Sequence, residues 1–214
     1  AACLFRDRNP ACCADICVSS DDEFLLDLVR RFDLVCVKRP AALAEDETPK
    51  LLAIKHSLVY MEEKQNRKYD YVMDLDITSP LRKIEDMENA LKTLEKHAEL
   101  DVVFSAVPAR RNPYFNMVER RNGKMRKIID GGFSARQQAP EVYDMNASIY
   151  CYRRDSILHK LEGSPLDGVF DIVLTRDTGV LDIDDEDDFA LMEILAQHFF
   201  AAEFKELYTY TCTM

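Results

Sequence analysis

Short runs rich in valine and isoleucine alternate with longer segments of helical periodicity along most of this 214-residue chain. Such alternation is typical of βα units, in which a helix crosses over between two parallel strands of one sheet. The runs that we predict to be strands are residues 14–20, 34–39, 69–77, 100–107, 146–153 and 179–184. The sequence therefore predicts an α/β fold with three layers and a mainly parallel sheet.

Four of the intervening segments carry signals for the start of a helix. Ser79 and Thr48 are each followed by proline, and a cap residue before a proline favours a helix beginning there. Residues 22–32 and the segment from residue 185 onward are predicted as two further helices. A length of 214 residues is ordinary for one domain of this kind, so we predict a single domain over residues 1–214.

Residues 108–140 interrupt the alternation of strands and helices. This stretch holds two prolines, many basic residues, a Gly-Gly pair and the dipeptide Asn122-Gly123. Asn-Gly between two short extended segments favours a tight β-hairpin. We therefore predict an antiparallel excursion at about residues 108–140, inserted into the domain.

The composition excludes several classes of protein. A formal net charge of -11, without a basic stretch that contains aromatics, argues against a nucleic-acid partner. The sequence has no apolar run near 18 residues and no signal peptide, so we expect neither a membrane span nor secretion. Seven cysteines without paired CxxC motifs indicate a reduced, cytoplasmic protein. The chain does not begin with methionine, and we expect it to start inside a longer protein.

The first candidate site follows the third predicted strand. Ligands of parallel sheets bind beyond the carboxyl ends of the strands. There Thr78 and Ser79 precede the expected helix start, and free backbone N–H groups beside Arg82 would suit a carboxylate or a phosphate. The simpler interpretation is that Thr78 and Ser79 only cap a helix while Arg82 is solvated.

The second candidate site closes the last predicted strand. Asp182 and Asp184 are two residues apart and would share one face of a strand. Paired carboxylates with phosphate oxygens and water suit Mg²⁺, so a metal site is one interpretation and an ordinary strand end is the other. The acidic run at 185–188 is expected to cap the following helix.

The third candidate site lies in the interrupting stretch. Arg136 is followed by Gln137 and Gln138, which could present a planar cation and amides to a ligand rich in carboxylate and hydroxyl groups. A solvated loop arginine is the alternative.

Five segments, in this order, resemble the acylneuraminate cytidylyltransferase family. They are ICVSSDDEFL, VKRPAALAEDETP, DITSPLR, ARQQAPEVYDMNASIY and VLDIDDEDDF, and together they span most of residues 14–190. The resemblance implies a nucleotide-diphospho-sugar transferase type of fold, with the excursion as a dimerisation arm in a homodimer. It also implies a transfer of CMP from CTP to a nonulosonic acid that depends on Mg²⁺ or Mn²⁺ and releases pyrophosphate.

The resemblance implies a role for each candidate residue. Asp182 and Asp184 match the family's metal carboxylates and are the expected catalytic residues. Arg39, near the cytosine, and Asp46 are the expected nucleotide-binding residues. The residues expected to bind the sugar are Asp76, Thr78, Ser79, Arg82, Arg136, Gln137 and Asn146.

Three departures from the family pattern are visible. Asp76 and Ile77 stand where the family usually has Gln-Pro, and a carboxylate can only accept hydrogen bonds, so we expect a different preferred sugar. Ala147-Ser148 replaces the Gly-Ala that usually follows the pocket asparagine. The first glycine is Gly123, so the family's Gly-rich triphosphate loop cannot lie upstream of it in these residues.

Two other functions stay open at this point. A noncatalytic homologue would keep the sugar pocket and the dimer surface, and would bind or regulate without measurable affinity for CTP. A sugar-nucleotide glycosyltransferase would use Asp74-Leu75-Asp76 as a metal-binding DxD motif, but it leaves the ARQQAP and DITSPLR segments without a role.

Overall fold

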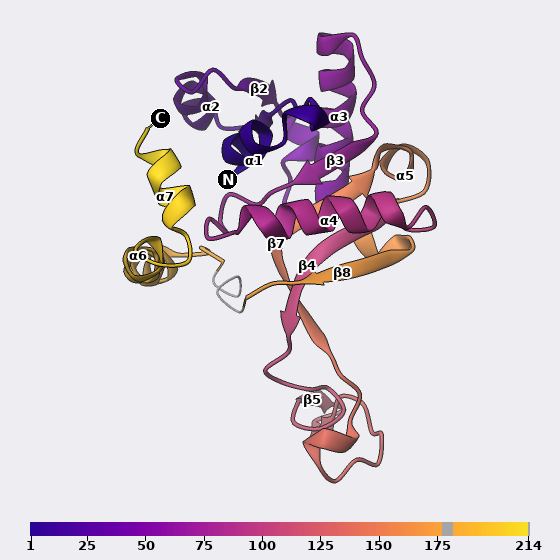
Figure 1. Cartoon of the computed structure of the whole chain (residues 1–214). Coiled ribbons are helices and arrows are strands. Elements are labelled where there is room, and N and C mark those ends of the chain that lie inside the picture. The colour runs from indigo at the N-terminus through magenta and orange to yellow at the C-terminus, as the bar shows by residue number, and fades with distance from the viewer. Residues whose placement is uncertain (177–181, 214) are drawn as a thin grey trace.

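The predicted α/β fold is present in the computed structural model, which describes residues 1–176 and 182–213 (Figure 1). Two parallel strands, β1 (Cys17–Ser20) and β2 (Val35–Lys38), form one sheet. A second sheet has the order β3-β7-β4-β8, made of β3 (Tyr71–Asp74), β7 (Tyr143–Arg153), β4 (Val102–Pro108) and β8 (Phe170–Leu174). In the second sheet β7 runs antiparallel to both of its neighbours, while β4 and β8 are parallel.

Five of the six predicted strands overlap an observed strand. Phe170–Leu174 was not predicted, although it pairs with the central strand β4 along its whole length. The expected strand at 179–184 lies partly outside the described residues, and residues 182–184 are not in a strand. Their backbone groups bond to a turn and a helix cap instead of a neighbouring strand.

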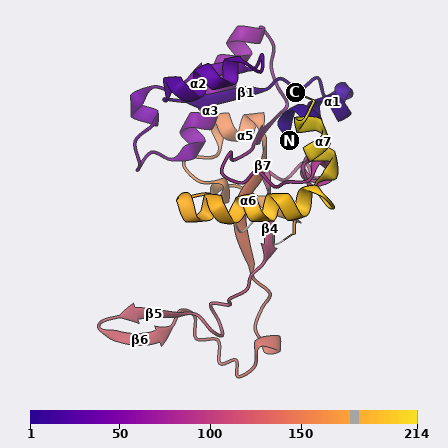
Figure 2. The ribbon, with the colours of Figure 1, turned by 90° about the vertical axis from the view of Figure 1, so that its left-hand side faces the viewer.

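Helices cover both faces of the four-stranded sheet and make the three layers. On one face the core is built from α4 (Ile84–Lys96), α1 (Ala2–Arg8), α6 (Glu186–Phe200) and α7 (Lys205–Thr211). On the other face it is built from α3 (Lys50–Gln65) and α5 (Arg154–His159). The views in Figures 1 and 2 show α6 and α7 at the edge of the body, with α7 close to the N-terminal helix α1.

The remaining helices are short or belong to the first sheet. The amphipathic helix α2 (Glu23–Arg30) contacts β1 and β2, and the side chain of Asp22 caps it by accepting from the backbone N–H of Phe24. Single 3-10 turns occur at Pro10–Cys12, Ala41–Leu43, Arg136–Gln138 and Pro165–Asp167.

The predicted helix start at Ser79 is wrong. Helix α4 begins at Ile84, and residues 79–83 are not helical. A residue before proline is biased toward extended backbone, which opposes a helix start at Ser79-Pro80. The Arg82 side chain adds to this effect, because it turns inward to the sheet instead of pointing to solvent.

The start predicted at Thr48-Pro49 is confirmed in position but not in mechanism. Helix α3 begins at Lys50, directly after Pro49, and no side chain caps it. The Thr48 hydroxyl donates to the carbonyl of Ala42 instead. The start predicted at Asp185 is confirmed in both respects, since its carboxylate accepts from two backbone N–H groups of α6.

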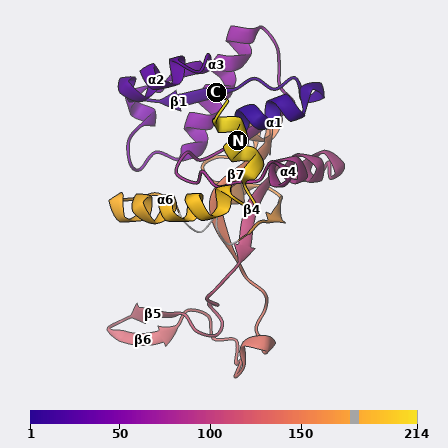
Figure 3. The ribbon, with the colours of Figure 1, turned by 60° about the vertical axis from the view of Figure 1, so that its left-hand side comes forward.

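Residues 109–142 leave the sheet after β4 and return to it at β7, and they project away from the body of the protein (Figure 3). Within them β5 (Val118–Arg121) and β6 (Lys124–Lys127) pair antiparallel. Asn122 and Gly123 join the two strands with φ values of 53° and 76°, the left-handed backbone that a tight two-residue turn requires. The predicted hairpin is therefore present, and we call residues 109–142 the arm.

All seven cysteines are free thiols. No helix formed by residues 1–176 and 182–213 has both the length and the apolar character needed to cross a membrane.

Candidate functional site

Two carboxylates lie where strand β3 ends, and one lysine bridges them. Asp74 is the last residue of β3, and Asp76 follows in the turn. The Lys50 ammonium, on the first residue of α3, is 2.7 Å from Oδ2 of each carboxylate. The carboxylates keep 19% and 29% of their side-chain surface exposed, so the three groups form a partly sheltered ion triad.

Burial and charge act in opposite directions on this triad. Burial raises the pKa of Asp74, and the Lys50 ammonium only partly offsets that effect. Burial alone would lower the pKa of Lys50, but the two carboxylates outweigh it and leave that pKa raised. Oδ2 of Asp74 is inaccessible and has no well-aligned hydrogen bond among the described residues. Charge attraction from Lys50 is therefore its main compensation.

Tyr150, in β7, lies beside the triad and within electrostatic range of a third carboxylate, that of Asp182. The Lys50 ammonium lies 5.8 Å from the centre of its ring. Burial raises the pKa of the phenol; Lys50 opposes that rise, and the carboxylates of Asp74, Asp76 and Asp182 add to it. Asp182 therefore belongs to the same group of charges. We call Lys50, Asp74, Asp76, Asp182 and Tyr150 the charged cluster.

The backbone holds the segment of Asp182 against the turn after β3. The N–H of Ile183 donates to the carbonyl of Thr78 over 3.1 Å. Oδ1 of Asp182 is buried and has no hydrogen-bond partner among the described residues. Asp184 is exposed, and its N–H donates to Oδ2 of Asp188 over 3.2 Å.

These carboxylates fit a hard cation such as Mg²⁺. A buried carboxylate oxygen without a partner, as in Asp182, is a suitable ligand for such an ion. Across residues 1–176 and 182–213, no group of three or more His, Cys, Asp or Glu side chains is arranged to hold a metal on its own. Mg²⁺ typically takes one or two carboxylates and completes its shell with water and phosphate oxygens. The cluster therefore suits a cation that arrives with a phosphorylated ligand.

Arg82 faces the interior, so the alternative of a solvated arginine is wrong. Only 8% of the residue is exposed, and burial lowers its pKa to about 10. Its guanidinium donates to the carbonyl of Asp76 and to Oγ of Ser148, the latter over 3.3 Å. The neighbouring Ser79 is also buried. Both residues shape the turn that carries Asp76.

The side chain of Asn146 joins β7 to β4 and to the residue that directly follows β8. Its Oδ1 accepts from the Ser105 hydroxyl over 2.5 Å, and its Nδ2 donates to Oγ1 of Thr175 over 2.7 Å. The residue is 6% exposed. Both ends of the amide are thus engaged inside the protein, and the next residue, Ala147, has a φ of 50°.

Arg39 and Asp46 lie beyond the first sheet. Arg39 follows β2, and its guanidinium donates to the carbonyl of Ser19 over 2.9 Å. Its own N–H donates to the carbonyl of Ser20, so Arg39 is fixed at the carboxyl ends of β1 and β2. Asp46 is exposed in the loop before α3.

Arg136 and Gln137 are not brought to the charged cluster of their own chain. They lie in the arm, which projects away from the sheet (Figure 1). The Arg136 guanidinium donates to the carbonyl of Ala109 over 3.2 Å, and Gln137 is exposed.

Lys50 and Tyr150 are the members of the cluster that the sequence reasoning missed. Tyr150 lies in a strand that was predicted, but nothing in its spacing distinguishes it from a core aromatic. Lys50 did carry a signal. A cation in the first turn of a helix opposes the helix dipole, so its presence there indicates an acidic partner nearby.

The chain has relatives of similar sequence among known proteins. No family model matches the chain. The chain is 35% identical over 197 residues to the CMP-N,N'-diacetyllegionaminic acid synthase of Campylobacter jejuni, and 34% identical over 197 residues to the post-translational flagellin modification protein B of Campylobacter coli. Each alignment covers 90% of this chain and 81% of the relative.

Two solved structures share the fold at low sequence identity. A CMP:2-keto-3-deoxy-manno-octonic acid synthetase complexed with CTP has a TM-score of 0.58 and 15% identity, covering 87% of this chain and 82% of that one. The 4-diphosphocytidyl-2C-methyl-D-erythritol synthase of Anaerococcus prevotii has a TM-score of 0.56 and 11% identity, covering 86% and 78%. These likenesses show the nucleotidyltransferase type of fold.

Proposed function

The chain belongs to the family of CMP-nonulosonate cytidylyltransferases, and we propose on that premise that it transfers CMP from CTP to a nonulosonic acid and releases pyrophosphate. The observation that carries the proposal is the charged cluster at the end of β3. It places the carboxylate of Asp182, which suits a cation, beside a turn that can receive a sugar. Ligands of α/β sheets bind at this end of the strands.

The reaction needs positioning more than covalent help from the protein. The anomeric hydroxyl of the sugar attacks the α-phosphorus in line and releases its proton to solvent, an O–P bond forms, and the bond to the bridging oxygen of the leaving pyrophosphate breaks. We assign Asp182 and Asp184 to hold Mg²⁺ or Mn²⁺. That ion, when bound, neutralises phosphate charge. Asp76, Thr78 and Ser79 form the turn that orients the sugar.

We assign the cytidine end of CTP to the carboxyl ends of β1 and β2. Arg39 is already oriented there by the carbonyls of Ser19 and Ser20, which leaves little side-chain freedom to lose on binding. Asp46 lies exposed in the following loop.

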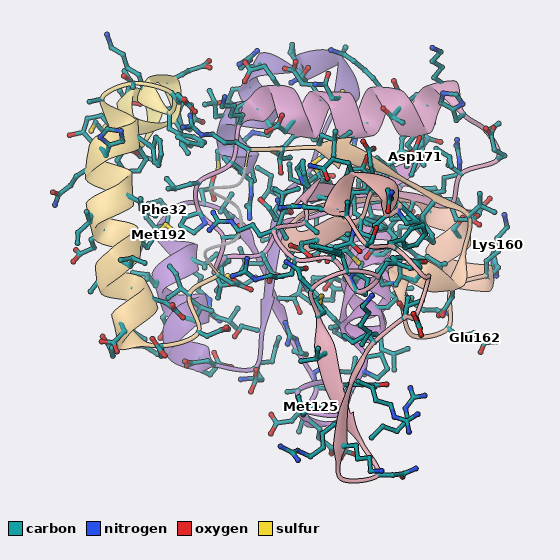
Figure 4. The ribbon with its side chains drawn as sticks, turned by 90° about the horizontal axis from the view of Figure 1, so that it is seen from below. Phe32, Met125, Lys160, Glu162, Asp171 and Met192 are labelled. Atoms are coloured by element: carbon teal, nitrogen blue, oxygen red, sulfur yellow. The ribbon has the colours of Figure 1, made fainter. Side chains whose placement is uncertain are left out.

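We propose a homodimer formed through the arm. Residues 109–142 contain eight basic and three acidic residues, a net charge of +5, whereas the whole chain carries -11, so the remainder carries -16. Apolar side chains exposed on the arm are Met117, Val118, Met125, Ile128 and Ile129. Met125 is labelled on the projecting arm in Figure 4. A basic and apolar arm complements the acidic body of a second copy.

A dimer would also account for the place of Arg136 and Gln137, which could reach the sugar pocket of the partner but lie away from their own. We place the protein in the cytoplasm, where free thiols stay reduced.

The test uses the product of the complete gene with CTP, Mg²⁺ and a panel of nonulosonic acids, and measures pyrophosphate. We expect pyrophosphate release with at least one sugar; no release with any sugar of the panel would refute the proposal. Binding titrations with the sugar and with CTP distinguish the alternative of a noncatalytic homologue, because such a homologue binds the sugar without affinity for CTP. A DxD site at Asp74 and Asp76 is disfavoured, since the Lys50 ammonium already pairs with both carboxylates and stands where the metal ion would bind.

A further inference from the structure

We propose that Lys50, Asp74 and Asp76 form a specificity-determining subsite, in which Lys50 fixes Asp76 so that its free carboxylate oxygen accepts a hydrogen bond from an N–H or O–H group of the sugar. The inference rests on the proposed function and concerns which sugar acids the enzyme selects. Asp76 is the contact residue; Lys50 and Asp74 act through it as positioning residues.

Asp76 is held from two sides. Its Oδ2 contacts the Lys50 ammonium at 2.7 Å, and its backbone carbonyl accepts from the Arg82 guanidinium. Its Oδ1 has no hydrogen-bond partner in the part of the chain that the structure describes, and 29% of the side chain is exposed. A fixed, accessible carboxylate oxygen is a preorganised acceptor, and hydrogen bonds to a charged acceptor are the stronger kind.

Asp74 supplies the anchor that keeps Lys50 in place. The lysine stands at the start of α3, where the helix dipole repels a cation. Its contact with Asp76 would compete with solvent if it were alone, but the sheltered carboxylate of Asp74 holds the same ammonium at 2.7 Å. Asp74 therefore holds Lys50 in place, and Lys50 in turn holds Asp76.

The subsite lies beside the expected reacting centre. The carboxylates of Asp76 and Asp182 both raise the pKa of the Tyr150 phenol. The backbone N–H of Ile183, next to Asp182, donates to the carbonyl of Thr78, two residues after Asp76. A sugar placed near a cation at Asp182 would thus meet Asp76 with one of its substituents.

The chemistry of the triad sets the preference. A carboxylate accepts and cannot donate, so a ligand carbonyl or carboxylate at this point is repelled, whereas an acylamino N–H or a hydroxyl is bound. A ligand that lacks the donor leaves the acceptor desolvated and unpaired, which is where polar sites gain their largest discrimination. We infer that the preferred substrates are nonulosonic acids with an acylamino group facing Asp76.

The test compares two nonulosonic acids that differ at one carbon, where one carries an acylamino group and the other only hydrogen. We expect wild-type kcat/KM to favour the acylamino sugar by about 10-fold to 100-fold. In Asp76→Asn the amide oxygen should face Lys50 and the NH₂ should face the ligand, because an ammonium cannot accept. The acceptor becomes a donor, and the preference should fall by about 10-fold while KM for CTP stays within about twofold.

Variants of the lysine test the positioning role. Lys50→Met should reduce the preference in the same direction, Lys50→Arg should largely restore it, and Lys55→Met is the matched control on the same helix, since its ammonium only donates to the carbonyl of Leu158. If Lys50→Met does not fold because Asp74 loses its counter-charge, the double variant Lys50→Met/Asp74→Asn removes both charges and must also lose the preference.

The outcomes separate the two proposals. An active Asp76→Asn enzyme with an unchanged preference would overturn the subsite and leave the cytidylyltransferase function intact. No pyrophosphate from any sugar would overturn that function instead. Equilibrium binding of the same two sugars to wild type and Asp76→Asn then decides on the subsite: equal relative affinities in the two proteins, or no binding at all, reject it.

Discussion

The backbone N–H of Ile183 donates to the carbonyl oxygen of Thr78 over 3.1 Å. This bond joins two segments that are more than a hundred residues apart, and it brings the turn after β3 against the segment that carries Asp182 and Asp184. A sugar-binding turn and a pair of cation-binding carboxylates are useful to a cytidylyltransferase only when they are adjacent. The contact therefore links the two halves of the proposed site.

Asp182→Asn should lower kcat by about 100-fold or more and raise the Mg²⁺ concentration needed for half-maximal rate, because one buried anionic ligand is replaced by a neutral amide. Pyrophosphate release measured against Mg²⁺ checks this. Asp187→Asn is the matched control: it removes an exposed charge from the first turn of α6 and should leave the Mg²⁺ dependence unchanged. Equal behaviour of the two variants would remove Asp182 from the metal site.

Asn146→Ala should lower the free energy of unfolding by about 2–3 kcal/mol, because it removes the hydrogen bonds by which this side chain joins β7 to Ser105 of β4 and to Thr175 after β8. Urea denaturation measures the loss. Asn89→Ala, at an exposed position of α4, is the control and should change stability by less than about 0.5 kcal/mol. A stable Asn146→Ala protein with a raised KM for the sugar would show that binding, not stability, is the main role of this side chain.

The sequence predicted the existence of most helices and strands better than the residues at which they begin and end. Alternating periodicity located β3, β4 and β7 because each is long or strongly apolar. It missed β8, in which Asp171 interrupts the apolar run. It also placed the start of α4 at Ser79, because the inward turn of Arg82 depends on Ser148, which is 66 residues away.

The site was predictable only where its chemistry lies within one segment. The spacing of Asp182 and Asp184 predicts a cation site from local sequence alone, and this stays a prediction, since residues 182–184 are not in the strand that the spacing assumed. The ion triad was not visible, since Lys50 and Asp76 meet only after α3 packs beside the end of β3. The side chain of Asn146 was predicted to bind sugar, but its partners are Ser105, in β4, and Thr175, which directly follows the unpredicted strand β8.

Stability should fall on the acid side partly through Asp101. Burial works against ionisation of its carboxyl, but the ammonium of Lys160, the hydroxyl of Ser156 and the N–H of Val169 outweigh it and lower its pKa. A carboxyl with a lowered folded pKa stabilises the protein above its unfolded pKa of about 3.9, and that contribution is lost as pH falls through the folded value. Asp101→Asn should therefore flatten the stability profile below about pH 4 and lower stability at pH 7.

Denaturation midpoints measured between pH 7 and pH 3 check this prediction. Asp155→Asn serves as the control, because its carboxylate is exposed and, among the residues that the structure describes, pairs only with the neighbouring Arg154. A profile of Asp101→Asn parallel to that of wild type would contradict the assignment.

Reversing two charges on the arm should dissociate the proposed dimer. Lys124→Glu/Arg126→Glu places two acidic residues on one exposed face of β6, where they would repel the acidic body of a second copy. Light scattering with size exclusion should show wild type at about twice the 24.7 kDa chain mass and the variant at that mass. Lys92→Glu/Lys96→Glu changes net charge equally on α4 and should remain dimeric. A monomeric wild type would exclude the homodimer.

Ala147→Gly should leave stability unchanged or raise it by up to about 1 kcal/mol. Ala147 has a φ of 50°, a left-handed conformation that costs an alanine roughly 1–2 kcal/mol and costs glycine almost nothing. The greater freedom of glycine in the unfolded chain offsets about 0.5–1 kcal/mol of the stabilisation gained by relieving this strain. Ala53→Gly, in the interior of α3, lacks the strain and should lower stability by about 1 kcal/mol. If urea denaturation shows the two variants destabilised alike, Ala147 is not strained, and the glycine usual in the family has another purpose there.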